Sequence, residues 1–559
     1  MEASRLVFLI VLCVSLFMLG ENWMKAYGPK PQVAGAPAKG MPGGELSPVP
    51  QRQPEAAGQA AGPAGASPST PPTYWADSAK NSTVTVRTDV MLVEIGTIGG
   101  DIRKVSLLRH GSVDDPAEPF VLLQPGGEHT YVAQSGLVGA GLATHKTPFV
   151  ADATALTLEP AQDELVLTLT EAEPQRGSKT TKRYRFKRGS YVIDVSQEVR
   201  NTGTDTLSPF AYYKLVRDEK PPKGDSYWVP TFTGLAAYTE KDKYKKIAFS
   251  DVAKGKVTLP KDVQDGWIGM VQHYFVSAWL PAQGVPREFY ARSLGEGLFE
   301  AGVIVPAGSA APGEAVVSAV PIYVGPQEQD KLAALAPGLD LTVDYGWLTV
   351  IAVPLFWVLA HIHDWVKNWG VAIILLTILI KLAFYPLSAA SYRSMAKMRI
   401  LAPKLQKLKE VHGDDRQKLH QAMVEMYKTE KINPLGGCLP IVVQIPVFIA
   451  LYWVLLGSVE MRQAPFVLWI KDLSAQDPFY VLPVLMGLSM IIQTRLNPEP
   501  PDPVQAKVMK IMPIAFSVFF FFFPAGLVLY WLVNNILSIA QQWAINHQLE
   551  KAGLGANKR

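Results

Sequence analysis

Cysteine is scarce in this sequence: among 559 residues there are two, Cys13 and Cys438, and both stand inside apolar runs. They form no C-x-x-C pair and have no metal-ligand spacing, which argues against a disulfide framework and a structural zinc site. The formal net charge of +4 is small for this length and gives no reason to propose DNA binding. No G-x-S-x-G, H-E-x-x-H or phosphate-loop motif occurs. We therefore predict no catalytic residue, no metal site and no cofactor.

The first 78 residues predict an anchor followed by a tether. Residues 1–27 contain Arg5 and then an apolar core from Leu6 to Leu19, with no A-x-A site close behind. This pattern favours an uncleaved signal-anchor span over a cleaved signal peptide. Pro, Gly and Ala then fill 27 of the 45 positions from 29 to 73, a composition that cannot bury enough surface to fold. We assign residues 28–78 to a disordered tether.

Residues 79–342 predict a large β domain. STVTVRTDVMLVEI and ELVLTLTEA alternate apolar and polar residues, and KRYRFKRGSYVIDVSQEVRNTG holds two strand-like runs around a glycine. Many short strands with Gly and Pro turns are typical of a β-sandwich. Carboxylates such as Asp194 and Glu198 belong to the solvated face of this pattern. The domain is therefore interpreted as an extracytoplasmic binding or scaffolding module.

The last 200 residues predict membrane spans. A spanning helix needs about 20 apolar residues, and a run of more than about 30 must cross twice. Apolar runs of spanning length occur at 369–389, 437–456, 479–493 and, as one continuous run, 511–544. Pro524-Ala525-Gly526 is the natural break in the last run, which makes six spans with the N-terminal anchor. The fifth, Ile511 to Phe523, would cover only about 20 Å.

The segment at 343–368 needs separate treatment, because counting it as a span would invert everything after it. It contains Pro354, His361, His363 and Asp364 together with several tryptophans. These features favour an amphipathic helix that lies in the membrane interface. The five-span core then covers residues 369–546.

Basic residues predict the orientation of the spans. The loop at 390–435 carries ten Lys/Arg, whereas the loop at 458–477 carries two. The positive-inside rule places 390–435 in the cytoplasm, together with both termini and the basic tail at 547–559. Apolar residues in this loop are spaced by three and four on either side of His412-Gly413-Asp414-Asp415, which predicts a helical hairpin. The hairpin is either a self-packed coiled coil with a solvated face or a surface for anionic lipid, RNA or acidic segments, and both can hold.

Lys381 stands within a predicted span, where a charge costs about 2.5–3.5 kcal/mol. One explanation is snorkelling toward the cytoplasmic end near Ser388, although a lysine stem reaches only part of that distance. A buried ion pair lacks a partner, because the spans contain no Asp or Glu. The remaining explanation is a water-filled cavity open to the cytoplasm. Polar residues at comparable depth support a cavity, although each alone is as typical of a helix–helix hydrogen bond: Thr377, Gln444, Ser517, Asn534 and Asn535.

Several motifs resemble one family closely. The runs YPLSAASYRSMAKMRILAPKL, NPLGGCLPIVVQIPVFIALYW, GSVEMRQAPFVLWIKDLSAQDP and FPAGLVLYWLVNN resemble the YidC membrane-protein insertases of Gram-negative bacteria over residues 346–550. The resemblance implies a polytopic α-helical inner-membrane protein with a periplasmic β-sandwich domain. Its five-helix core would hold a positively charged groove that is open to the cytoplasm and to lipid.

The resemblance also implies site residues and partners. Lys381 falls at the family's groove charge, which is often arginine, so the charge is kept but the planar fork is lost. The implied groove residues are Lys381, Thr377, Gln444, Ser517, Asn534 and Trp531, and the implied hydrophobic slide is Phe448, Met486 and Phe519. The implied partners are nascent membrane proteins, the Sec translocon, membrane lipids, and the ribosome and signal recognition machinery through the cytoplasmic loop and tail.

Two other functions compete with insertion. A solute transporter would use Lys381 as a substrate or proton site, but it predicts internal repeats and paired ionisable residues, and the spans show neither. An envelope carbohydrate enzyme or binding protein would make the β domain the working part, on fold-level analogy alone.

Overall fold

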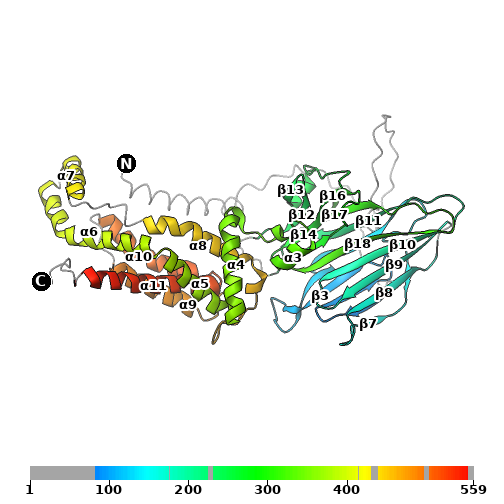
Figure 1. Ribbon diagram of the computed structural model, residues 1–559, viewed down its shortest axis with the longest axis horizontal. Coiled ribbons are helices and arrows are strands. Elements are labelled where there is room, and N and C mark those ends of the chain that lie inside the picture. The colour runs from blue at the N-terminus through cyan, green and yellow to red at the C-terminus, as the bar shows by residue number, and fades with distance from the viewer. Residues whose placement is uncertain are drawn as a thin grey trace. The chain divides into compact units, whose positions relative to one another are not determined.

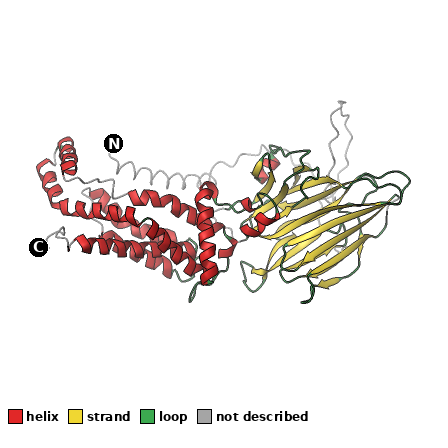
Figure 2. Ribbon diagram, in the orientation of Figure 1, coloured by secondary structure: helices red, strands yellow, loops and turns green. Residues whose placement is uncertain are grey.

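The computed structural model describes residues 82–174, 177–223, 231–412, 415–429, 439–496, 503–549 and 551. The chain divides into two compact units, one formed by residues 29–343 and the other by residues 1–28 together with 344–559. The first unit is built of strands and the second of helices (Figure 2). The predicted anchor at 1–27 and tether at 28–78 lie outside the described residues.

The β unit contains two nine-stranded sheets, and Figure 1 labels most of their strands. Neighbouring strands are antiparallel except for β1 and β7, which pair in parallel. The first sheet has the order β16 (Glu288–Gly295), β17 (Leu298–Pro306), β11 (Phe210–Asp218), β5 (His129–Val138), β4 (Pro119–Gly126), β3 (Ile102–Gly111), β2 (Met91–Gly96), β1 (Thr83–Arg87) and β7 (Ala155–Thr157).

The second sheet is antiparallel along the pairs that join its strands. Its order is β13 (Lys243–Ile247), β12 (Gly234–Thr239), β14 (Trp267–Gln272), β15 (Phe275–Trp279), β18 (Ala315–Pro326), β10 (Val192–Asn201), β9 (Ser178–Lys187), β8 (Glu164–Glu171) and β6 (Phe149–Ala151). Three short helices complete the unit: α2 (Phe249–Ala253), α3 (Gln329–Leu335) and η1 (Asp340–Thr342).

The sheets pack face to face because each strand turns alternate side chains inward. In β8, Leu165, Leu167 and Leu169 are buried while the residues between them are more exposed. These leucines join side chains of the other sheet, such as Val93 of β2, in one continuous hydrophobic core. Gly189, at a φ of 67°, allows the turn between β9 and β10.

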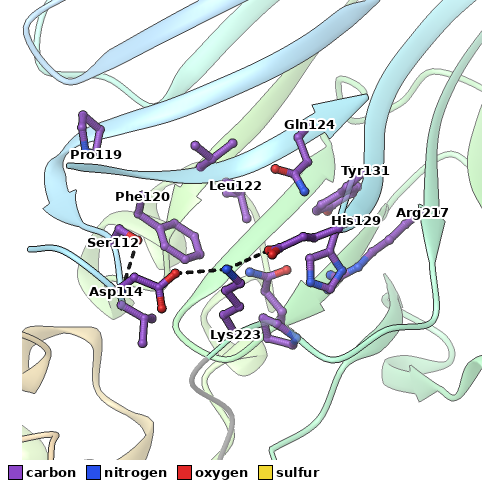
Figure 3. Close-up of a pocket in the computed structure, with 15 residues that line it drawn as sticks. Ser112, Asp114, Pro119, Phe120, Leu122, Gln124, His129, Tyr131, Arg217 and Lys223 are labelled. Carbon is purple, nitrogen blue, oxygen red and sulfur yellow. Dashed lines mark hydrogen bonds and ion pairs between the residues drawn. The ribbon is translucent and has the colours of Figure 1, made fainter. Parts of the chain in front are cut away.

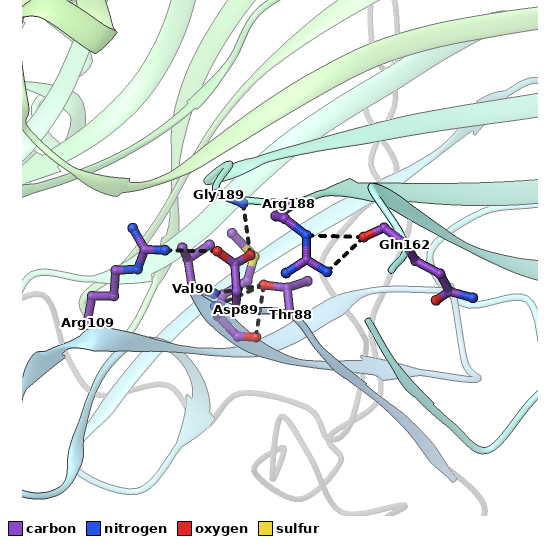
Figure 4. Close-up of polar contacts among 8 residues, drawn as sticks. Thr88, Asp89, Val90, Arg109, Gln162, Arg188 and Gly189 are labelled. Atoms are coloured by element: carbon purple, nitrogen blue, oxygen red, sulfur yellow. Dashed lines mark hydrogen bonds and ion pairs between the residues drawn. The ribbon is translucent and has the colours of Figure 1, made fainter. Parts of the chain in front are cut away.

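One polar cluster ties the turns of the two sheets together (Figure 4). Asp89 lies in the turn between β1 and β2, where it accepts hydrogen bonds from the Gly189 backbone N–H at 2.8 Å and from Arg109 at 2.8 Å. The Thr88 hydroxyl closes the same turn by accepting from the Met91 backbone N–H at 3.0 Å. Because Gly189 belongs to the second sheet, Asp89 fixes one turn against the other.

The β unit contains buried charged side chains. Lys214 of β11 and Glu300 of β17 form an ion pair of 2.9 Å, and both side chains are 0% exposed. Lys182 of β9 donates to the carbonyl oxygens of Gly99 at 2.6 Å and Ser135 at 2.7 Å. Burial raises the pKa of Asp101 from 3.8 to about 7, although the Lys182 ammonium opposes the shift. The sandwich therefore carries ionisable groups that are sensitive to pH near neutrality.

The second unit is a helical bundle (Figure 1). α11 contacts α5, α6, α8 and α9, while α4 contacts α5 and α8. Figure 1 shows α4 crossing the ends of α5 and α8, which run side by side with α9, α10 and α11. The described helices are η2 (Gly346–Leu348), α4 (Thr349–Val366), α5 (Trp369–Ala383), α6 (Tyr385–His412), α7 (Arg416–Thr429), α8 (Leu439–Gly457), η4 (Val459–Met461), α9 (Val481–Leu496), α10 (Pro503–Phe520) and α11 (Ala525–Leu549).

The span predicted over 369–389 contains a break that the sequence analysis did not predict. The helix breaks at Phe384, and the two parts, Trp369–Ala383 and Tyr385–Ser394, meet at an angle of 64°. The physical reason is Pro386, which has no N–H to donate to the preceding turn but fits the first turn of a new helix. The apolar run continues across the break, so hydropathy alone does not reveal it.

The prediction for the fifth span also needs correction. Its helix begins at Pro503 and ends at Phe520, so it has 18 residues instead of the run from Ile511 to Phe523. At 1.5 Å per residue this helix is about 27 Å long. The helix includes polar residues before the apolar run, and it can begin at Pro503 because proline fits the first turn of a helix.

Length and composition alone identify few spans among the described residues. Gly346–Val366 is the one described helix that is long and apolar enough to cross a membrane, and the bent pair at Phe384 would add a second. Two further apolar stretches, Val443–Gly457 and Val481–Leu496, are shorter. The described helices therefore do not by themselves establish the six predicted spans.

Candidate functional site

Lys381 lies in the last turn of α5, where it faces α11. The helix begins behind Asn368, whose side chain accepts a hydrogen bond from the Val371 backbone N–H at 3.0 Å. Three turns later the Lys381 Nζ donates to the Ser538 Oγ at 2.7 Å. No described residue forms an ion pair with this lysine. A hydroxyl from another helix is therefore the direct partner of the charge.

A chain of hydrogen bonds extends from Lys381 across three helices. The Ser538 hydroxyl donates to the Asn534 carbonyl oxygen one turn earlier on α11, at 2.7 Å. The Gln444 side chain of α8 donates to the Asn534 side-chain oxygen at 2.6 Å. The predicted residues Lys381, Gln444 and Asn534 thus come together from α5, α8 and α11.

Ser538 is the site residue that the sequence analysis missed. It stands four residues after Asn534, so both fall on one face of α11, and that spacing was the available signal. Serine side chains in membrane helices often bond to a carbonyl of their own helix. The spacing alone therefore does not identify Ser538 as a site residue. The structure shows the backbone bond and the contact with Lys381 together.

A small crevice opens beside Lys381. It is lined by Ile380, Phe384, Leu387, Ser388 and Gln444 as well as Lys381 itself. Between these described residues the cavity volume is about 10 Å³, close to the room that one ordered water needs. The crevice adjoins the break at Phe384, so the bend between α5 and α6 forms one of its walls.

Three of the predicted groove residues do not join this cluster, namely Thr377, Ser517 and Trp531, and Trp531 packs among aromatic rings instead. Thr377 is buried, and its hydroxyl donates to the Ile373 carbonyl of its own helix at 2.6 Å. Ser517 of α10 donates to the Pro483 carbonyl of α9 at 3.0 Å. Both hydroxyls therefore bond to helix carbonyl oxygens. Asn535 of α11 likewise donates to the Ser489 hydroxyl of α9, at 3.2 Å.

The predicted slide residues lie in different environments. Phe448 of α8 packs edge-on against Trp531 of α11 with ring centroids 4.4 Å apart, and Phe520 of α10 lies 5.5 Å from Trp531. Phe519 is 52% exposed and Met486 of α9 is 0% exposed. The aromatic cluster Phe448–Trp531–Phe520 therefore joins three helices, and Phe519 points outward beside it.

Among the residues that the structure describes, no group of His, Cys, Asp or Glu could hold a metal ion. The arrangement around Lys381 offers a cationic donor, amide and hydroxyl groups and nearby aromatic rings. These groups can bind and release a polar or acidic segment.

Comparison with known proteins places the chain in a family. The family model described as the YidC periplasmic domain matches residues 83–358, and the model described as 60Kd inner membrane protein matches residues 361–552. The membrane protein insertase YidC of Nitrosospira multiformis is 53% identical over 576 residues, covering 100% of this chain and 99% of that protein. The membrane protein insertase YidC of Methylobacillus flagellatus is 55% identical over 554 residues, covering 99% of this chain and 98% of that protein.

A crystal structure of an active YidC insertase aligns with 82% of this chain and 94% of its own, at 17% identity and a TM-score of 0.38. These values are low, so the assignment rests on the sequence relatives. Near-complete coverage at more than half identity, together with both family models, confirms the resemblance. The chain belongs to the YidC membrane protein insertase family of inner-membrane proteins that carry a periplasmic domain.

Proposed function

We propose that this chain is a non-enzymatic insertase that passes nascent membrane proteins into the inner membrane along a groove centred on Lys381. The observation that carries the proposal is the Lys381 ammonium between α5 and α11, bonded to Ser538 and paired with no carboxylate among the described residues. A structural lysine at this depth would be expected to have an acidic partner. An ammonium whose direct partner is a hydroxyl can instead exchange that partner for a client's acidic or polar tail.

The proposed topology has six spans with both termini in the cytoplasm and the β unit in the periplasm. Its main support is the direction of α4, which crosses the ends of α5 and α8 (Figure 1). A helix that runs across a bundle cannot span the bilayer that the bundle spans. Trp347 is 79% exposed and Trp365 is 83% exposed, which suits an interfacial helix despite its spanning length.

The proposed mechanism divides the work between a polar and an apolar surface. The client's tail binds near Lys381, while its apolar part passes along α8 and α10, where Phe448 and Phe519 stand. Transfer of apolar surface into lipid supplies about 25 cal/mol per Å², so no nucleotide is required. The bond at Lys381 must be transient, because a tail held too tightly would not leave.

The proposed partners follow from the same topology. The helices α6 and α7 would stand in the cytoplasm, where the basic loop at 390–435 can meet the ribosome and the signal recognition machinery. The basic tail at 547–559 would contribute to that contact, and the bundle would work beside the Sec translocon for some clients.

Insertion of a reporter by purified protein in proteoliposomes tests the proposal. Lys381→Ala should slow insertion of a client with an acidic tail about tenfold or more, since a charge-assisted hydrogen bond contributes about 1.5–3 kcal/mol. Lys381→Glu should slow it further, and Lys381→Arg should retain it. Lys367→Ala is the matched control, because Lys367 is an exposed lysine after α4. Unchanged insertion by both Lys381→Ala and Lys381→Glu would refute the role of this charge.

A further inference from the structure

The β unit contains a hollow that the insertion mechanism does not use (Figure 3). Its cavity volume is about 200 Å³. The walls come from the β3–β4 loop, β4, the start of β5, the end of β11 and Gln272 at the end of β14. It therefore lies where several loops of the sandwich meet.

The hollow exists because β4 and β5 separate. Their pairing covers only Gln124 to Gly126, and beyond Gln124 the two strands diverge. Aromatic rings occupy part of the gap: Phe120 stacks on Phe275 with ring centroids 4.3 Å apart, and the Arg217 guanidinium lies 4.8 Å above the Tyr131 ring. The hollow thus has an aromatic surface on one side.

Two side-chain amides line this hollow without a protein partner. Gln272 is only 5% exposed, yet neither its side chain nor that of Gln124 makes a hydrogen bond to another described residue. Figure 3 shows the Gln124 amide and the rings of Phe120 and His129 around the same space. Gln124 is half-buried, and both amides line the hollow, so they are placed to exchange hydrogen bonds with a ligand that supplies donors and acceptors.

The charges around the hollow balance, with Asp114 and Glu128 on one side of the count and Lys223 and Arg217 on the other. The Lys223 Nζ lies 3.0 Å from Asp114 and 2.8 Å from Glu128, and His129 lies 3.4 Å from Asp218. Asp114 and Glu128 disfavour an anion, and Lys223 and Arg217 disfavour a cation. The ligand that fits is neutral.

We propose that this hollow binds a single neutral sugar ring. A cavity of about 150 Å³ holds benzene, so about 200 Å³ suits one substituted ring but not several residues of an extended peptide. Phe120 offers a face for the apolar side of the ring, and the amides of Gln124 and Gln272 pair with its hydroxyls. A client's aromatic side chain would fill the space but would leave both amides unpaired.

Binding to the full-length chain in nanodiscs tests the proposal, with D-glucose, D-galactose, N-acetylglucosamine and chitotetraose as probes in saturation-transfer NMR and calorimetry. At least one probe should bind at one site per chain. A free sugar as the source predicts that monosaccharides bind at least as well as chitotetraose, and a glycan chain predicts the reverse. Gln272→Ala should weaken binding about tenfold. Gln264→Ala, an exposed glutamine of the same unit, is the control and should leave binding unchanged.

Gln124→Ala provides a second variant on a half-buried position, in case Gln272→Ala does not fold, and thermal unfolding checks both. No binding of any of the four probes would overturn the proposal. Equal binding in the wild type and a folded Gln124→Ala variant would do the same, as would a polar peptide that binds this site while the sugars do not.

Discussion

Replacement of Ser538 by alanine tests how Lys381 is held before a client arrives. The Lys381 Nζ donates to the Ser538 Oγ at 2.7 Å, and the same hydroxyl is anchored to the Asn534 carbonyl at 2.7 Å. A hydrogen bond to a charged group contributes about 1.5–3 kcal/mol. An incoming tail that takes Lys381 must displace this bond, so Ser538 competes with the client.

We expect Ser538→Ala to bind the client more tightly and to release it more slowly. In Ser538→Ala a client tail should bind about tenfold more tightly, because 1.4 kcal/mol corresponds to about a factor of ten, and its release into lipid should slow. A photo-crosslinking residue in place of Phe384, which lines the crevice, reports occupancy, while a time course in proteoliposomes reports release. Ser538→Thr keeps the hydroxyl and should behave like the wild type.

Ser489→Ala is the matched control, since it removes a buried hydroxyl of α9 that bonds Asn535 and not Lys381. Weaker crosslinking in a folded Ser538→Ala protein would refute the reasoning, because it would mean that Ser538 helps to bind the client. Unchanged crosslinking and release would show that the bond in the structure is not broken during insertion.

Three further predictions concern the scaffold. Burial raises the pKa of Asp101 to about 7, so between about pH 4 and pH 7 the folded state keeps a proton that the unfolded state has lost, and the free energy of unfolding should fall as the pH rises. This pH-dependent loss is at most about 4 kcal/mol. Asp101→Asn should abolish it in thermal unfolding curves recorded across this pH range. Glu300→Gln should destabilise the β unit by about 3–5 kcal/mol in urea unfolding, because it removes the buried carboxylate that lies 2.9 Å from the Lys214 ammonium. Asp194→Asn, in an exposed pair, should cost under about 1 kcal/mol. Pro386→Ala should reduce the bend between α5 and α6, measured by the distance between spin labels on the two helices; an unchanged distance would contradict the assigned cause.

The sequence predicted the strands well because their side chains alternate. STVTVRTDV and ELVLTLTEA gave β1 and β8, and both strands keep the expected inward residues. The same alternation does not predict which lysines are buried. Lys182 and Lys214 look like members of a solvated face, yet both are buried because partners distant in the sequence satisfy their charge.

Hydropathy predicted where the helices lie but not where they begin and end. Apolarity found α8 within two residues of its start, whereas it missed the break at Phe384 and the polar first turns of α10. Hydropathy reports where a segment is buried, and Pro386 and Pro503 act through the backbone instead.

Within the site, Lys381, Gln444 and Asn534 could be predicted because they are polar or charged residues in apolar runs, and three helices bring them together. Ser538 could not be chosen, because its role depends on how α11 is rotated against α5. That rotation is set by packing, which no local pattern reports.

A photo-crosslinking residue at position 531, in the aromatic cluster between α8, α10 and α11, tests the central claim most directly. Ribosome-stalled chains of a membrane protein with an acidic tail should crosslink to this position at intermediate lengths and lose the adduct once insertion is complete. Lys381→Ala should reduce the adduct several-fold. A crosslink that is absent at every chain length, or that is unaffected by the loss of Lys381, would contradict the proposal that clients pass through this groove.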